Sequence, residues 1–143
     1  MNNPDLEFAA GFTGTLLHNC ASASCPRDAI RAASSYHWDM LALTERLEAL
    51  EGDIDKIIDF FTREWGWVIS YDADVGVLIA DENKPECVCP VARATHADAS
   101  LCACSEGFAE RLFTAALRRP VRSEVISSIL RGGAHCVYKI TIL

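Results

Sequence analysis

Residues 66–82 read GWVISYDADVGVLIADE, and within this stretch the apolar residues stop recurring at helical spacing and begin to alternate. Alternation with a period of two is typical of a strand with one buried and one exposed face. The stretch therefore predicts two short strands, at residues 67–71 and 75–80, joined by a turn at residues 72–74.

Upstream of this stretch the apolar residues recur every three or four positions, which predicts helices. The helices are expected within residues 5–25, 27–35, 37–52 and 54–65. Gly52 suits the end of the third helix, because glycine accepts the left-handed conformation of a C-cap. Asp53 is predicted to cap the fourth helix, whose apolar face carries Ile54, Ile57, Ile58 and Phe61.

Downstream, Ser105 is predicted to cap one more helix, which Pro120 ends. Residues 121–129 alternate again, and residues 135–143 supply another strand, with a glycine turn at residues 131–133 between them. This order predicts an α+β fold, with N-terminal helices on an antiparallel sheet, one helix between the sheet halves and a C-terminal β-hairpin.

The composition fits one domain over residues 1–143, made of a helical part at 1–64 and a mixed part at 65–143. A net charge of −7 argues against a nucleic-acid partner, which would require a basic face. The sequence has neither a secretory leader nor an apolar run that would span a bilayer, so a cytoplasmic protein is expected. In a reducing compartment the seven cysteines favour metal binding, redox chemistry or catalysis over disulfides.

Four of the cysteines form two pairs, Cys87 with Cys89 and Cys102 with Cys104, on either side of a polar loop. Four thiolates are a complete ligand set for zinc. On a strand, residues two apart lie roughly 6.5 Å apart, whereas sulfurs around one zinc lie about 3.8 Å apart. Pro90 and the predicted cap at Ser105 favour turns, so a metal site or a reactive thiol at the four cysteines is favoured over thiols packed in a core.

Other thiols and histidines leave further alternatives open. Cys20 and Cys25, with His18 nearby, either complete the four-cysteine group or form a separate site. Cys136 is expected to be a buried core thiol, because it lies in an alternating strand. His96, in the loop between the pairs, is a solvated side chain, a ligand or a base.

Three segments, ECVCP, LCACSEGFAERLF and RPVRSEVISSILRGGAHCVYKITI, resemble the 4-vinyl reductase domain. The same layout is similar to the aminothiazoline-carboxylate hydrolase-like family and, more distantly, to palmitate-binding subunits of the transport-particle vesicle tether. The resemblance covers about residues 65–143, and SILRGGAHCVYKI is its most specific part.

The resemblance implies an α+β domain with a pocket for a small apolar or amphipathic ligand, and a homodimer. It also implies a metal, proposed to be zinc in those relatives, at the cysteines that match by position: Cys87, Cys89, Cys102, Cys104 and Cys136. The leading hypothesis is therefore a small-molecule binding or sensing domain with a zinc site. Its candidate pocket walls are Phe60, Phe61, Trp65, Phe108, Leu112 and Phe113.

Two other functions remain open. One is a thiol-dependent hydrolase of a small heterocyclic acid, with Cys102 or Cys104 as nucleophile and His96 or His135 as base. The other is a redox protein that uses the cysteine pairs as dithiols. The three functions differ in whether the thiols hold a metal, react quickly with alkylating agents, or form reversible disulfides.

Overall fold

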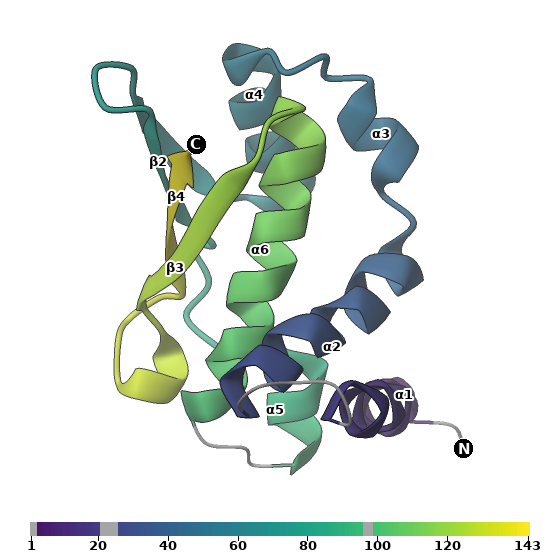
Figure 1. Cartoon of the computed structure of the whole chain (residues 1–143). Coiled ribbons are helices and arrows are strands. Elements are labelled where there is room, and N and C mark those ends of the chain that lie inside the picture. Colours follow the sequence, from purple (N-terminus) through teal and green to yellow (C-terminus); the bar gives the residue numbers. More distant parts are fainter. Residues whose placement is uncertain (1–2, 21–25, 96–98) are drawn as a thin grey trace.

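The computed structural model of this chain describes residues 3–20, 26–95 and 99–143. It has the predicted α+β architecture, with N-terminal helices, an antiparallel sheet, helix α6 between β2 and β3, and a C-terminal hairpin (Figure 1). The helices are α1 (Pro4–Cys20), α2 (Pro26–Leu41), α3 (Thr44–Glu48), α4 (Ile54–Trp65), α5 (Pro90–Thr95) and α6 (Cys102–Leu117). The strands are β1 (Val68–Asp72), β2 (Val77–Asp81), β3 (Val121–Ser127) and β4 (Val137–Ile142).

The prediction of one helix over residues 37–52 is wrong. Helix α2 continues from the preceding segment to Leu41, and α3 begins only at Thr44. Between them Ala42 has a φ of +48°, a left-handed conformation that interrupts helical hydrogen bonding and turns the chain. Apolar periodicity does not reveal this break, because Leu43 and Leu47 on the far side of it are still buried.

Helix α4 begins and ends where the sequence predicts. The Asp53 carboxylate accepts hydrogen bonds from the backbone N–H groups of Asp55 at 3.0 Å and Lys56 at 3.1 Å. These bonds satisfy two of the N–H groups that have no partner inside the helix. Gly66 ends the helix with a φ of +71° and sends the chain into β1.

The four strands form one sheet in the order β1-β2-β4-β3, and every neighbouring pair is antiparallel. Strand β3 begins at the predicted residue, and the other three strands begin one or two residues later than predicted. Leu78 opposes Ile140 in the register, and both are fully buried. The connection from β3 to β4 is longer than the predicted turn. Residues Ile129–Arg131 form a 3₁₀ turn, so Ile129 lies outside the strand that was expected to contain it.

Helix α6 begins four residues earlier than predicted. Its first residue is Cys102, and Ser105 lies within its first turn instead of capping it. A 3₁₀ turn at Ala99–Leu101 leads directly into the helix, and Leu101, at the N-cap position, makes no side-chain cap. Because the 3₁₀ turn continues directly into α6, the chain is already helical before Ser105, and Ser105 cannot be the N-cap.

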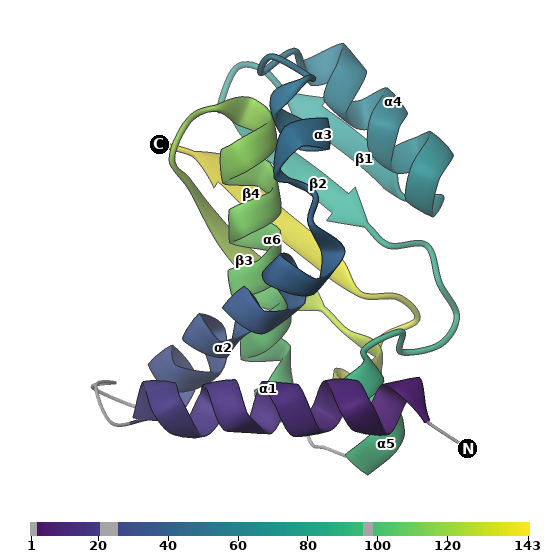
Figure 2. The same cartoon turned by 90° about the vertical axis from the view of Figure 1, so that its right-hand side faces the viewer.

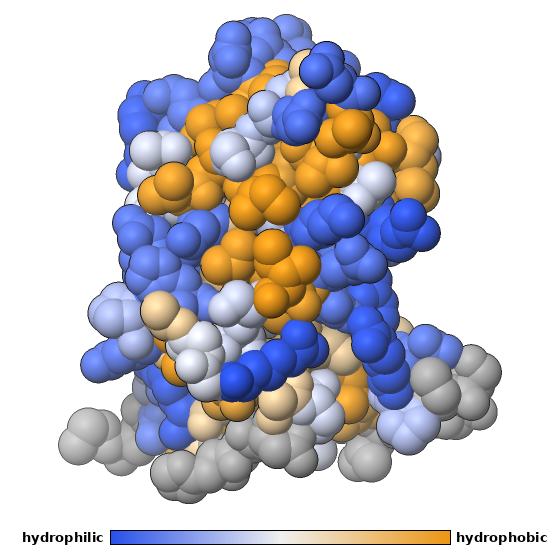
Figure 3. Space-filling view, turned by 90° about the vertical axis from the view of Figure 1, so that its left-hand side faces the viewer, coloured by the Kyte–Doolittle hydropathy of each residue, from blue (hydrophilic) through white to orange (hydrophobic). Residues whose placement is uncertain are grey.

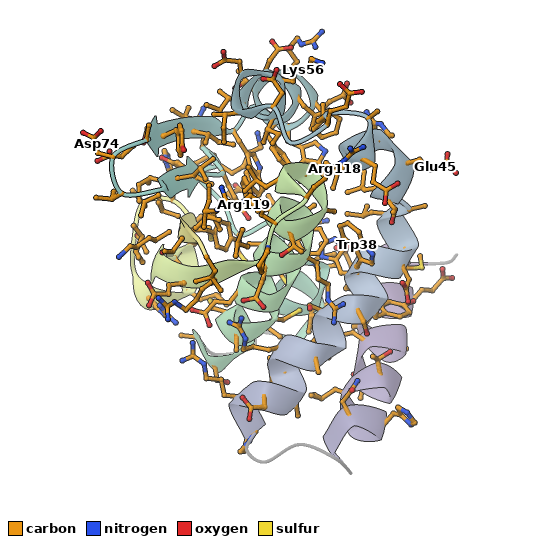
Figure 4. The ribbon with its side chains drawn as sticks, turned by 45° about the horizontal axis from the view of Figure 1, so that its top comes forward. Trp38, Glu45, Lys56, Asp74, Arg118 and Arg119 are labelled. Atoms are coloured by element: carbon orange, nitrogen blue, oxygen red, sulfur yellow. The ribbon has the colours of Figure 1, made fainter. Side chains whose placement is uncertain are left out.

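Helix α6 lies between the sheet and α2, while α1 and α5 pack across one end of this layered structure (Figures 1 and 2). The approach of α2 to α6 requires Gly107. A Cβ atom at this position would lie 2.4 Å from the carbonyl oxygen of Arg31, so any larger residue would push the helices apart. At the other end of α6, Arg118 points toward α3 and donates to the Glu48 carbonyl oxygen at 2.8 Å (Figure 4).

The opposite face of the sheet carries a band of apolar side chains (Figure 3). Val68 and Ile126, on the two edge strands, are 58% and 53% exposed. None of the described helices lies on this side of the sheet (Figure 1). Among the described residues, no helix combines the length and the apolar character needed to cross a bilayer.

Candidate ligand-binding site

A cavity of about 520 Å³ lies where the first turns of α6 meet the sheet, α1 and α2. This volume is within the range of small-molecule sites, about 300–1,000 Å³. Two of its lining residues, Leu41 and Val88, are 41% and 45% exposed, so the cavity reaches the protein surface there. The other apolar lining residues are Phe8, Trp65, Trp67, Pro90, Val91, Leu101, Phe108 and Leu130.

Aromatic rings form a continuous wall on the sheet side of the cavity. The ring centroids of Trp65 and Trp67 are 5.3 Å apart, and those of Trp67 and Tyr138 are 5.9 Å apart with nearly parallel planes. Trp67 also stacks on the buried ring of Phe61 behind it. The planes of Trp65 and Trp67 are tilted by 59°, so the wall is an angled aromatic surface that the core supports from behind.

A short chain of hydrogen bonds crosses the apolar lining. The Tyr138 hydroxyl donates to the Glu82 carboxyl at 2.6 Å, and Ser105 also hydrogen-bonds the Tyr138 hydroxyl. Burial raises the pKa of Glu82, opposed by the Tyr138 hydrogen bond and by Lys84. Burial, with Glu82 nearby, raises the pKa of Tyr138 well above its usual range. These are the convergent polar groups that orient a ligand in an otherwise apolar site.

The charged residues that line the cavity differ in their partners. Glu64 forms an ion pair at 2.8 Å with Arg46, a residue that does not line the cavity. Lys84 donates from Nζ to the Trp65 carbonyl oxygen at 2.7 Å. Within the described part of the chain, the Glu82 carboxyl forms no ion pair; it accepts a hydrogen bond from the neutral Tyr138 phenol and is attracted by Lys84.

His37 lines the cavity on the α2 side. Its ring stacks on Phe108 at a centroid distance of 4.1 Å and meets the Phe8 ring edge to face at 5.1 Å. Burial lowers the pKa of His37 to about 4, so the imidazole is neutral near pH 7. In this state His37 serves as a third aromatic surface next to Phe8 and Phe108.

All four cysteines predicted as zinc ligands line this cavity, together with Cys136. Cys87 and Cys89 come from the irregular segment before α5, and Cys102 and Cys104 from the first turn of α6. All five are free thiols. The structure therefore brings together the residues that the sequence grouped, although they belong to separate segments of the chain.

The predicted turn around Cys102 and Cys104 is wrong, because both residues are helical. Residues two apart on a helix point in nearly opposite directions. Cys102 packs in the core against the sheet and lies 3.4 Å from the Ser128 hydroxyl, whereas Cys104 packs in a second cluster with Cys87 and Cys89. The helix thus separates the two sulfurs.

The pKa values of the buried thiols are shifted upward. Burial raises the pKa of Cys104 to about 12 and that of Cys136 to about 11. Burial also raises the pKa of Cys89, despite hydrogen bonds from the backbone N–H groups of Ala92 and Val91. An activated nucleophile has the opposite shift.

The donor set suits zinc in its chemistry, because soft thiolates are preferred zinc ligands. However, no group of three or more His, Cys, Asp and Glu side chains among the described residues is placed to hold a metal ion. The arrangement of these four thiols therefore does not fit a zinc centre as it stands. Zinc binding at Cys87, Cys89, Cys102 and Cys104 stays a prediction.

Other residues considered in the sequence lie outside this site. Cys25 and His96 fall among residues 21–25 and 96–98, and the Cys20 side chain is likewise outside the described residues. His18 is exposed on α1 and does not line the cavity. The His135 ring nitrogen lies 3.1 Å from the Asp81 carboxyl and is also not a lining residue.

The six predicted pocket walls divide into two groups. Trp65 and Phe108 line the cavity, whereas Phe60, Phe61, Leu112 and Phe113 belong to the hydrophobic core. Sequence reasoning missed His37, Glu82 and Tyr138. Alternation along β4 does place Tyr138 on the buried face with Ile140, but nothing in the sequence indicates that Glu82 reaches its hydroxyl.

A scan against protein-family models finds no match, and no curated protein sequence matches the chain.

Proposed function

We propose that this chain binds a small apolar or amphipathic molecule in the cavity beside α6, as a binding or sensing domain. The observation that carries the proposal is a cavity of about 520 Å³ with aromatic walls and one internal polar chain, Glu82, Tyr138 and Ser105. The resemblance to 4-vinyl reductase domains supports the same function. A cytoplasmic location, in which the thiols stay reduced, is part of the proposal.

The test is binding of the neutral fluorescent probe N-phenyl-1-naphthylamine, followed by its own emission. The wild-type chain is expected to bind one probe per chain. Replacing Trp65 with alanine removes part of the aromatic wall, and we expect the probe affinity to fall about tenfold, equivalent to about 1.4 kcal/mol. Probe binding that is absent from the folded wild-type chain contradicts the proposal.

Trp38 provides the matched control. It is a half-buried tryptophan that packs against the same core as Trp65, but it lies on α2 beside α6 and does not line the cavity (Figure 4). Trp38→Ala is therefore expected to destabilise the fold similarly to Trp65→Ala while leaving the probe affinity within about twofold of wild type. Equal loss of affinity in both variants would place the probe elsewhere.

Thiol chemistry at the same cavity is the second candidate function, because all four predicted ligands and Cys136 line it. Elemental analysis of untagged protein, with thiols titrated before and after chelation, separates the alternatives. One zinc per chain and four thiols released by chelation support the metal site. No metal and one fast-reacting thiol support the hydrolase, and a reversible disulfide supports the redox protein.

A further inference from the structure

The two acidic residues that line the cavity differ in their ion pairing. Glu64 is neutralised by Arg46, whereas Lys84 attracts Glu82 electrostatically but donates its hydrogen bond to the carbonyl oxygen of Trp65 at the C-terminus of α4. A cation is stabilised at that end of a helix by the helix dipole. Glu82 remains without an ion-pair partner in the described part of the chain.

The surroundings of Glu82 suit a positively charged group. The Glu82 carboxyl is joined to the Tyr138 hydroxyl, and the Tyr138 ring stacks beside Trp67, which lies against Trp65. Aromatic faces attract cations through their quadrupole, and the attraction is strongest for tryptophan. A carboxylate next to such a wall attracts the same ligand charge, and burial strengthens the attraction because water screens it less.

We propose that the cavity selects an amphipathic organic cation, a protonated amine on an aromatic or apolar body, with the ammonium group at Glu82 and the body against Trp65 and Trp67. This inference rests on the proposed ligand-binding function and specifies the ligand class. A bound cation also compensates the burial of the Glu82 carboxylate, which otherwise raises the pKa of that group.

Three ligands of similar shape test the charge preference: 1-naphthylmethylammonium, 1-naphthalenemethanol and 1-naphthoate. Each is titrated against the full chain at pH 7 by displacement of N-phenyl-1-naphthylamine. The ammonium is expected to bind at least about tenfold more tightly than the alcohol, and the alcohol more tightly than the carboxylate. Alcohol binding equal to or tighter than ammonium binding overturns the inference, as does preferred binding of the carboxylate through Lys84.

Two glutamate variants then locate the preference. Glu82→Gln is expected to reduce the ratio of ammonium to alcohol affinity to within about twofold. Glu64→Gln is the matched control, because Glu64 also lines the cavity but is already paired with Arg46, and it should keep most of the preference. An unchanged ratio in Glu82→Gln contradicts the assignment of the ammonium site.

The outcomes distinguish this inference from the proposed function. Binding of the neutral probe and the alcohol without a preference for the ammonium leaves the function standing and overturns the inference. Absence of binding by the probe and all three ligands overturns both. If Glu82→Gln fails to fold, the three-ligand comparison on the wild-type chain decides alone.

Discussion

Glu106 shows how one buried side chain joins three elements. It is 3% exposed on α6 and receives hydrogen bonds from Arg27 and Arg31 on α2, the second at 2.9 Å. Its other carboxyl oxygen accepts the backbone N–H of Val125 on β3 at 2.8 Å. The sequence gives no sign of this role, because the partners lie far away along the chain.

We expect Glu106→Gln to lower the free energy of unfolding by about 2–3 kcal/mol, because a buried partner of charged groups is lost. Urea denaturation measures the change. Glu110→Gln is the control: Glu110 also pairs with Arg31 but is 39% exposed in its side chain, so a loss below about 1 kcal/mol is expected. Equal effects of the two substitutions would show that burial of Glu106 is unimportant.

At the scale of elements, the helix ends are the features that local chemistry determines best. Asp53 caps α4 as predicted and the helix ends at the predicted Trp65, because a cap bond and a left-handed residue such as Gly66 act within a few positions. The predicted helix over residues 37–52, which breaks at Ala42, and the predicted cap at Ser105 were wrong because they depend on more than local chemistry. There, the direction of the neighbouring segment decides where the helix breaks or begins.

Asp53→Ala removes the side-chain cap of α4, and we expect a loss of about 1 kcal/mol in the free energy of unfolding. The comparison is Asp59→Ala, an exposed residue of the same helix that forms only an i,i+4 ion pair with Arg63, where a change within about 0.5 kcal/mol is expected. Thermal and urea unfolding of both variants test the difference. An unchanged free energy of unfolding in Asp53→Ala would mean that water satisfies the first N–H groups of α4 as well as the carboxylate does.

At the scale of the whole molecule, folding encloses a histidine in an apolar site, which makes the stability depend on pH. His37 has a pKa of about 4 in the folded chain and about 6.5 when unfolded. Between these values the unfolded chain binds more protons, so stability is fully present above pH 6.5 and decreases as the pH falls toward 4.

Over this window we expect His37 to lower the free energy of unfolding by about 2 kcal/mol. This value follows from about 1.4 kcal/mol per pKa unit, reduced because the side chain is partly exposed. His37→Phe keeps a ring between Phe8 and Phe108 and removes the titration. Urea unfolding from pH 7.5 to pH 4.5 should therefore show a smaller decrease for the variant than for the wild type. If the free energy of unfolding falls equally with pH in both proteins, protonation of His37 does not destabilise the fold.

The homodimer implied by the resemblance stays a prediction at this scale, and sedimentation velocity tests it.

The sequence by itself determined the fold class and the bounds of α4. The change of period at residues 66–82, the cap at Asp53 and the alternation before the final hairpin all depend on neighbours within a few residues. It also grouped Cys87, Cys89, Cys102 and Cys104, which the structure places around one cavity.

Only the tertiary structure decided which aromatic residues line the cavity and which fill the core. Phe108 and Phe113 share one helix, yet the first faces the cavity and the second is fully buried, since the packing of α2 and the sheet differs along α6. The Glu82–Tyr138 hydrogen bond likewise joins residues 56 positions apart. Such pairs depend on the register of β2 against β4 and on the path of the chain after β2, which no local pattern records.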